Sequence, residues 1–238
     1  MNQLDIPIEL SDAWVRLQQA ADEYVALQHA VNEFLYEYLK GMPMGKDPET
    51  GEFFISLRHP KDSIMSGKPK VLVGQMIENC RVALDYMVYE LSLKNHKDLE
   101  YEHAPQFVIS DTEARFNKEA KHKLQYLTDE QREFIRSIQP FKGNALLGIF
   151  RDATNKSKHR QLLTITDMTG FDIYFDSAKN KHKYKDAWLL KEEDGQVFFA
   201  RPKDRAVLLM NEYKAIPILK AIAEHTGEIV LASRKFFK

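Results

Sequence analysis

The chain has 238 residues, of which 44% are apolar and 29% charged, as is usual for a folded globular protein. Its 34 Lys and Arg residues nearly balance 35 Asp and Glu residues, so the net charge of −1 provides no overall attraction to nucleic acid or to a membrane. The single cysteine, Cys80, excludes an internal disulfide and a thiolate-rich metal site, and we expect no metal or other cofactor. We find neither an apolar run long enough for a membrane span nor a secretion signal, and therefore expect a cytoplasmic protein.

The first half of the chain favours long helices. Apolar residues recur at three- and four-residue steps through residues 11–40, with Ser11 or Asp12 as the expected N-cap. Turn residues are dense from 45 to 70, around a short strand pattern at 53–57, which indicates a β excursion. Residues 71–93 predict a second helix. Its expected buried face consists of Met76, Cys80, Leu84, Met87 and Leu91.

The second half changes from helical to strand patterns. Helices are predicted over 112–122, 128–138 and 145–159, and Thr128 with Gln131 forms the signature of a capping box. Strand patterns then follow at 162–166, 171–175, 187–190, 197–200 and 206–210, with Asp194-Gly195 as the strongest hairpin turn. A helix over 216–236 closes the chain. We expect an α+β fold, with a helical region over 1–165 and antiparallel strands plus a closing helix over 166–238, packed as one domain.

A first polar constellation lies on the predicted helix over 71–93. Glu78, Arg81 and Asp85 fall within about 60° of one another on a regular helix, away from its apolar face. An arginine between carboxylates at i−3 and i+4 is typical of a surface ladder of ion pairs. On so apolar a helix the same strip is also compatible with a partly buried site, in which arginine orders the site or holds a phosphate.

A second constellation follows at 151–160. On a helix Asp152, Asn155 and His159 share one strip, while Arg151, Asn155 and Lys158 share the next. Cations beside His159 favour its neutral form, which suits a general base near neutral pH. The alternative is a solvated basic helix end that interacts favourably with the helix dipole.

Together the two segments resemble an uncharacterised bacterial family. Its members carry Gly-Asp-x-x-His-Asn-x-Arg-Ser-Ala-Leu-Asp-His and, about 70 residues later, Asn-x-x-Lys-His-Arg after a Gln-Pro-aromatic sequence. The first motif is also similar to the Arg-x4-6-His signature of HEPN-type helical ribonucleases. The matching residues in this chain are Gly74, Asn79, Arg81, Ala83, Leu84 and Asp85, then Gln139-Pro140-Phe141, then Asn155, Lys158, His159 and Arg160.

The resemblance implies a HEPN-like protein that binds RNA or cleaves it without metal, in stress or phage defence, commonly as a homodimer. In that interpretation His159 is the acid or base, Arg81 and Lys158 stabilise the phosphate, and Asp85 and Asn155 hold these groups in place. The further residues expected to bind are Glu78, Asn79, Tyr86, Arg151, Asp152 and Arg160.

The sequence departs from the family pattern at the signature histidine. Tyr86 takes that position, and tyrosine does not titrate near pH 7 unless it is strongly perturbed. Residues 81 and 86 also lie about 140° apart on a regular helix. Arg115 and His122 match the same spacing, and we interpret that match as chance because the signature is short.

Two rival functions remain open. One is a non-catalytic interaction or nucleotide-sensing protein, in which the two constellations form a structural polar network. The other is a toxin-type nuclease partner whose activity needs a second chain. The basic run at 179–185 is expected to be a solvated loop between strands, with an RNA-backbone contact as the alternative.

Overall fold

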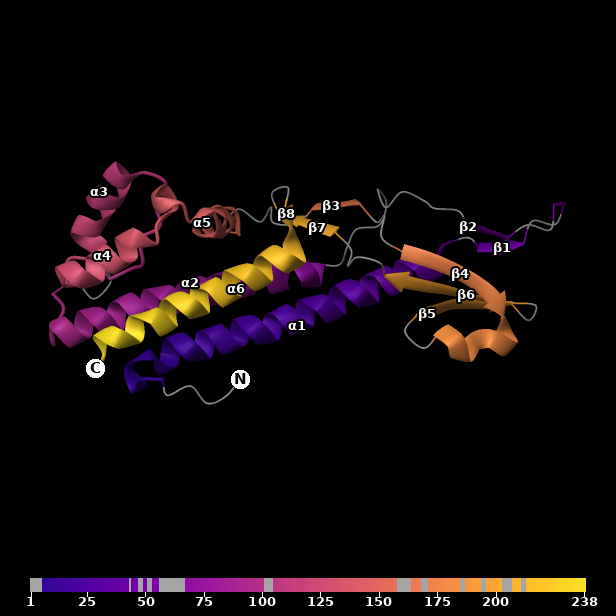
Figure 1. The fold of residues 1–238 in the computed structure, drawn as a ribbon, viewed down its shortest axis with the longest axis horizontal. Helices are drawn as coiled ribbons and strands as arrows, with labels where there is room; N and C mark the ends of the chain where they lie inside the picture. The colour runs from indigo at the N-terminus through magenta and orange to yellow at the C-terminus, as the bar shows by residue number, and fades with distance from the viewer. Residues whose placement is uncertain are drawn as a thin grey trace. The chain divides into compact units, whose positions relative to one another are not determined.

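The computed structural model describes residues 6–42, 44–46, 49–50, 53–55, 67–100, 105–157, 164–167, 171–184, 187–193, 196–202, 207–210 and 213–238. It confirms the α+β class (Figure 1). The chain divides into two compact units, and each is assembled from separate stretches of sequence. Unit 1 comprises Met1–Val25, Val71–Leu162 and Ala215–Lys238, and unit 2 comprises Ala26–Lys70 and Leu163–Lys214.

Helices make up unit 1. Its long members are the first half of α1 (Ser11–Lys40), α2 (Gly67–Asn95) and α6 (Ala215–Ala232), which is followed by the 3-10 turn η5 (Ser233–Phe236). Three shorter helices, α3 (Glu113–Lys123), α4 (Asp129–Ser137) and α5 (Ala145–Ser157), complete it, with the 3-10 turn η3 (Pro140–Lys142) before α5.

The apolar face predicted for the second helix is confirmed. Its five expected members are at most 1% exposed: Met76, Cys80, Leu84, Met87 and Leu91. Burial raises the pKa of the Cys80 thiol to about 12, although Thr226 of α6 hydrogen-bonds to it. This thiol is therefore a packing group between α2 and α6 rather than a nucleophile.

Two predicted helix starts are wrong. Ser11 is not an N-cap but already helical, with φ −59° and ψ −44°, because the 3-10 turn η1 (Ile8–Leu10) leads directly into α1. The second helix begins at Gly67 rather than 71, since Pro69 lies within the first turn, where its missing N–H costs no helical hydrogen bond.

The predicted capping box of α4 is confirmed. The Thr128 side chain accepts from the backbone N–H of Gln131, whose own side chain accepts from the backbone N–H of Thr128. The same Gln131 oxygen also accepts from Asn95 at 2.7 Å, which ties α4 to the end of α2.

Unit 2 contains the strands. An antiparallel pair joins β1 (Met44–Lys46) to β2 (Phe53–Ile55), and β2 lies within the strand pattern predicted at 53–57. The later strands form two three-stranded antiparallel sheets instead of one. The first has the order β3 (Thr164–Asp167), β7 (Val207–Met210), β8 (Tyr213–Lys214), and the second β4 (Phe171–Ser177), β6 (Gln196–Pro202), β5 (Trp188–Glu193).

Register confirms the strongest predicted hairpin. Glu193 of β5 pairs with Gln196 of β6 across Asp194-Gly195, two residues that lie outside the described part of the chain. The basic run expected as a loop lies instead largely in a 3-10 helix, η4 (Ala178–Tyr184). The core of unit 2 joins the end of α1 to these strands through Leu39, Met42, Met44, Leu190, Phe198 and Ala200.

Candidate functional site

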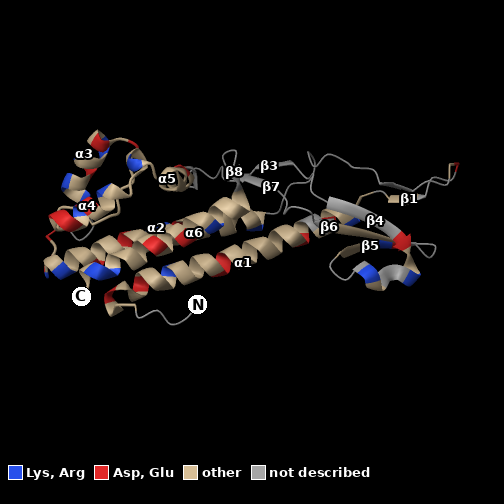
Figure 2. Ribbon diagram, viewed as in Figure 1, with Lys and Arg blue, Asp and Glu red and all other residues tan. Residues whose placement is uncertain are grey.

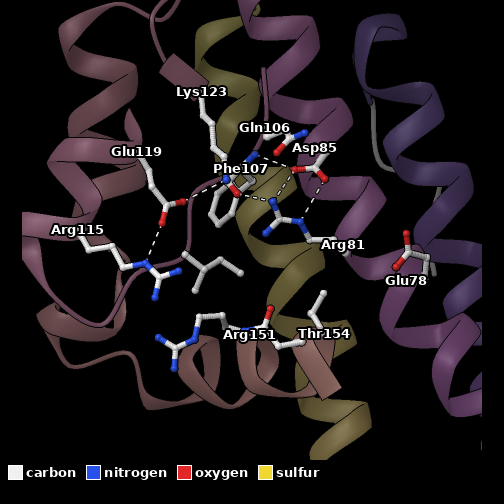
Figure 3. A pocket seen from close by; sticks show the side chains of 12 residues that line it. Glu78, Arg81, Asp85, Gln106, Phe107, Arg115, Glu119, Lys123, Arg151 and Thr154 are labelled. Carbon is white, nitrogen blue, oxygen red and sulfur yellow. Dashed lines mark hydrogen bonds and ion pairs between the residues drawn. The ribbon is translucent and has the colours of Figure 1, made fainter. Parts of the chain in front are cut away.

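A cavity of about 270 Å³ lies in unit 1, and polar and charged side chains dominate its wall (Figure 3). Three helices, α2, α3 and α5, contribute these side chains, together with the extended segment 105–110 that leads into α3. Two of the contributing elements, α2 and α5, carry the constellations found in the sequence.

On α2, Arg81 and Asp85 form a two-pronged ion pair. The Arg81 Nε donates to Oδ2 of Asp85 at 3.1 Å, and its Nη2 donates to Oδ1 at 3.0 Å. Glu78 lines the same cavity but is exposed, and no bond joins it to Arg81 within the described residues. The predicted ladder of charges is therefore formed only on the i+4 side of Arg81.

The same ion pair holds the backbone of Phe107. Asp85 Oδ1 accepts the Phe107 N–H at 2.8 Å, and Arg81 Nη2 donates to the Phe107 carbonyl at 2.5 Å. Burial raises the pKa of Asp85 above its ordinary value and outweighs the opposing effects of Arg81 and the Phe107 N–H. Arg81 and Asp85 thus fasten segment 105–110 to α2.

Gln139, at the end of the turn after α4, holds the rest of that segment. Its side-chain amide donates to the carbonyls of Val108 and Ile135, at 2.8 and 3.0 Å, and accepts the Ser110 N–H at 2.9 Å. Gln139 is completely buried. Side chains thus satisfy peptide groups of an extended segment that pairs with none of the described strands, and these groups would otherwise be left unpaired.

Along α3, charged residues at four-residue steps form a second wall. Glu119 accepts from Arg115 Nε at 2.8 Å and from Lys123 Nζ at 3.1 Å, and Figure 2 shows the mixture of basic and acidic residues on this helix. Burial alone would raise the pKa of Glu119, but the hydrogen bonds and charges of Arg115 and Lys123 prevail and lower it. Glu119 is therefore a bound anion between two cations.

The third wall is α5, through Arg151, Thr154 and Asn155. Arg151 pairs with its neighbour Asp152, at 2.7 Å from Nη2, and with Asp111. Asn155 is exposed at the cavity. Residues of the two constellations, separated by about 70 positions in the sequence, thus line one cavity.

Not every residue singled out in the sequence lies in this place. Lys158, His159 and Arg160 lie outside the described residues. Asp152 contacts Arg151 but does not line the cavity.

Asn79 and Tyr86 face α1 instead of the cavity. Asn79 donates to both carboxylate oxygens of Glu23 at 3.0 Å and accepts from Arg16 at 3.2 Å. The Arg16 guanidinium lies 5.9 Å from the centre of the Tyr86 ring. The side chains of Arg81 and Tyr86 therefore lie on different sides of α2, as their helical spacing implies.

Sequence reasoning missed the contribution of α3. Arg115, Glu119 and Lys123 repeat at i, i+4 and i+8, a signal of ion pairing that can be read from the sequence but does not reveal which way the ladder faces. The match of Arg115 to the HEPN signature is unrelated to this role, because His122 is exposed and does not line the cavity.

Hydrogen-bond donors remain available around the cavity. Among the described residues, no acceptor binds Nη1 of Arg81 or either Nη atom of Arg115. Guanidinium groups with free N–H donors bind phosphate and carboxylate groups well. The arrangement is thus chemically suited to an anion.

Within the described ranges, no three His, Cys, Asp or Glu residues form a group that could hold a metal ion. No helix in the same ranges combines the length and apolar character of a membrane span. In comparisons with protein-family models, with curated proteins and with solved structures, no match to this chain was found.

Proposed function

We propose that this is a HEPN-like cytoplasmic protein that binds RNA at the cavity between α2, α3 and α5 and cleaves it without metal. One observation carries the proposal: Arg81 of the first constellation and Asn155 of the second line the same cavity. Free arginine N–H donors beside it supply the positive charge that an RNA phosphate requires.

In the proposed reaction His159 is the acid and base. It takes the proton from a ribose 2′-hydroxyl as that oxygen attacks the adjacent phosphorus. The bond from phosphorus to the 5′ oxygen breaks, and the imidazolium returns its proton to that leaving oxygen. The products are a 2′,3′-cyclic phosphate and a 5′-hydroxyl end.

The other residues bind the phosphate or hold the reacting side chains in position. Arg81, through its free Nη1, and Lys158 stabilise the charge on the five-coordinate phosphorus. Asp85 holds the Arg81 side chain, and Asn155 orients His159 four residues further along the chain.

Cleavage of a mixed RNA pool in the presence of a chelator tests this function. A general acid or base contributes about 10²–10⁴ in rate, so His159→Ala should lose nearly all turnover. His122→Ala is the matched control, because His122 is exposed on α3 and lies outside the cavity wall. Full activity of the His159 variant would contradict the proposal.

The contact between Arg81, Asp85 and Phe107 favours a second candidate, a non-catalytic interaction or nucleotide-sensing protein. There the pair serves only to anchor the segment 105–110. Arg81→Ala would then lower the free energy of unfolding. No variant would change a cleavage rate, because a non-catalytic protein does not cleave RNA.

The HEPN likeness also supports a homodimer as the working form. Sedimentation velocity at micromolar concentration tests it: a species of about twice the 27.7 kDa chain mass is expected, and a single monomeric species would contradict it.

A further inference from the structure

We infer that the cavity between α2, α3 and α5 binds a phosphate monoester, held by Arg115 and Lys123 of α3, and that Glu119 occupies the place of this group when no ligand is bound. This inference rests on the proposed function for the site. It adds a subsite for a terminal phosphate on α3, beside the phosphodiester that is to be cleaved at Arg81.

Four cations from three helices line one small space, and the same wall carries the carboxylates of Glu78, Asp85 and Glu119. Arg81 comes from α2, Arg115 and Lys123 from α3, and Arg151 from α5. A phosphate monoester carries up to two charges and three terminal oxygens, so it can accept hydrogen bonds from several directions at once. A phosphodiester offers only two terminal oxygens and one charge, which makes poorer use of such a site.

Glu119 already acts as an anion within this wall. Its two oxygens are divided between Arg115 and Lys123. Arg115 is 59% exposed and Lys123 35%, so both can turn toward a ligand without uncovering the core. An incoming phosphate would thus take over the donors that Glu119 now holds, and Glu119 reduces the affinity of the resting site.

The size of the cavity favours a single phosphorylated group. At about 270 Å³ it is smaller than the roughly 300–1,000 Å³ of pockets that enclose drug-sized ligands. One phosphate with part of its sugar fits that volume, whereas several consecutive nucleotides do not. The ligand is therefore the phosphorylated end of an RNA or a small phosphate ester, and both share the same chemistry.

Binding measurements with four probes test the inference. The probes are a short fluorescent RNA with a 5′-phosphate, the same RNA with a 5′-hydroxyl, the same RNA with a 3′-phosphate, and ribose 5-phosphate as a competitor, all in chelator to suppress any metal effect. We expect at least one phosphorylated RNA to bind about tenfold more tightly than the hydroxyl form, as one or two charge-assisted hydrogen bonds provide. Competition by ribose 5-phosphate would identify a small ester as sufficient; no competition would assign the site to RNA ends.

Three variants separate this site from general attraction to RNA. Glu119→Gln should raise affinity for the phosphorylated probe about tenfold, because it frees Arg115 and Lys123 and removes a repulsive charge. Arg115→Ala should lower it by about the same factor. Lys118→Ala is the control, since Lys118 is exposed on the same helix and lies outside the cavity wall.

Equal binding of the hydroxyl and phosphorylated RNAs would overturn the inference, and so would a Glu119→Gln variant that binds no more tightly than the wild type. An equal loss in the Arg115 and Lys118 variants would also overturn it. Cleavage separates the two claims: monoester binding without RNA cleavage rejects only the proposed reaction, and cleavage without a preference for phosphorylated probes rejects only this inference.

Discussion

The carboxylate of Asp85 on α2 accepts the peptide N–H of Phe107 at 2.8 Å, while Arg81, paired to the same carboxylate, donates to the Phe107 carbonyl. One ion pair thus satisfies both backbone groups of a residue in an extended segment that pairs with none of the described strands. The same two side chains line the cavity. A substitution of either one therefore changes both the charge of the cavity and the position of the backbone at Phe107.

Removing this carboxylate should destabilise the protein. Asp85→Ala leaves the Arg81 guanidinium and the Phe107 N–H without their acceptor, and we expect a loss of about 1–3 kcal/mol in the free energy of unfolding. Urea titration followed by circular dichroism measures it. Glu78→Ala removes an exposed carboxylate from the same helix and should change stability by less than about 0.5 kcal/mol. Equal effects of the two substitutions would show that Asp85 does not anchor the segment.

Gln139 should prove at least as important for stability. Replacing it by Ala leaves the Val108 carbonyl and the Ser110 N–H buried and unpaired, and we expect a loss of about 2–4 kcal/mol. Gln18→Ala, on the exposed side of α1, serves as the control in the same unfolding experiment. A Gln139 variant as stable as that control would contradict the role assigned to its amide.

Asp85 and Glu119 should give opposite dependences of stability on pH. The pKa of Asp85 in the folded state is raised above its ordinary 3.8, so the folded protein holds this proton more firmly and the contribution of Asp85 falls as pH rises through that raised pKa. The pKa of Glu119 is lowered from 4.5, so its contribution is present above pH 4.5 and is lost as pH falls through the lowered pKa.

The matched neutral variants make this measurable. The stability of the wild type minus that of Asp85→Asn should decrease from pH 3.5 to 7, at about 1.4 kcal/mol per pH unit at most, whereas the same difference for Glu119→Gln should increase from pH 3 to 5. Two differences that change in the same direction would contradict the environments found for these carboxyl groups.

Restoring the signature histidine should not restore an Arg/His pair. Tyr86 lies beside Arg16 on the side of α2 that faces α1, so a histidine there is directed away from the cavity. We expect Tyr86→His to cleave RNA no faster than the wild type in a chelator-treated assay. A gain of tenfold or more would show that the chemistry depends on position 86 instead.

Much of the secondary structure could be predicted because it depends on neighbouring residues. The apolar spacing of α2, the Thr128–Gln131 capping box and the β5–β6 hairpin are all local patterns, and each is confirmed. The predicted start of α1 was wrong. A polar Ser11 is compatible with an N-cap, but the preceding residues Ile8–Leu10 already form a 3-10 helix that leads into α1.

The site could be predicted only in part. Helical spacing correctly separates Arg81 from Tyr86, and it places Asn155 on a polar strip. It does not reveal that Asn79, two residues before Arg81, donates to Glu23 of α1. Tertiary packing decides which helix lies against each side of α2, and the spacing along one helix does not contain that information. Segment 105–110 has no periodic signal, since the partners of its peptide groups, such as the side chains of Asp85 and Gln139 and the Lys123 carbonyl, are distant in the sequence.

The most direct measurement of the central claim is to map where RNA lies on the protein. A 5′-phosphorylated RNA containing 4-thiouridine near that end would be bound to the wild type, irradiated, digested and analysed by mass spectrometry. We predict cross-links to peptides from 105–123 and 145–157, which line the cavity, and their loss in Arg115→Ala. Cross-links confined to the basic helix η4, or an unchanged pattern in the Arg115 variant, would contradict the placement of RNA in this cavity.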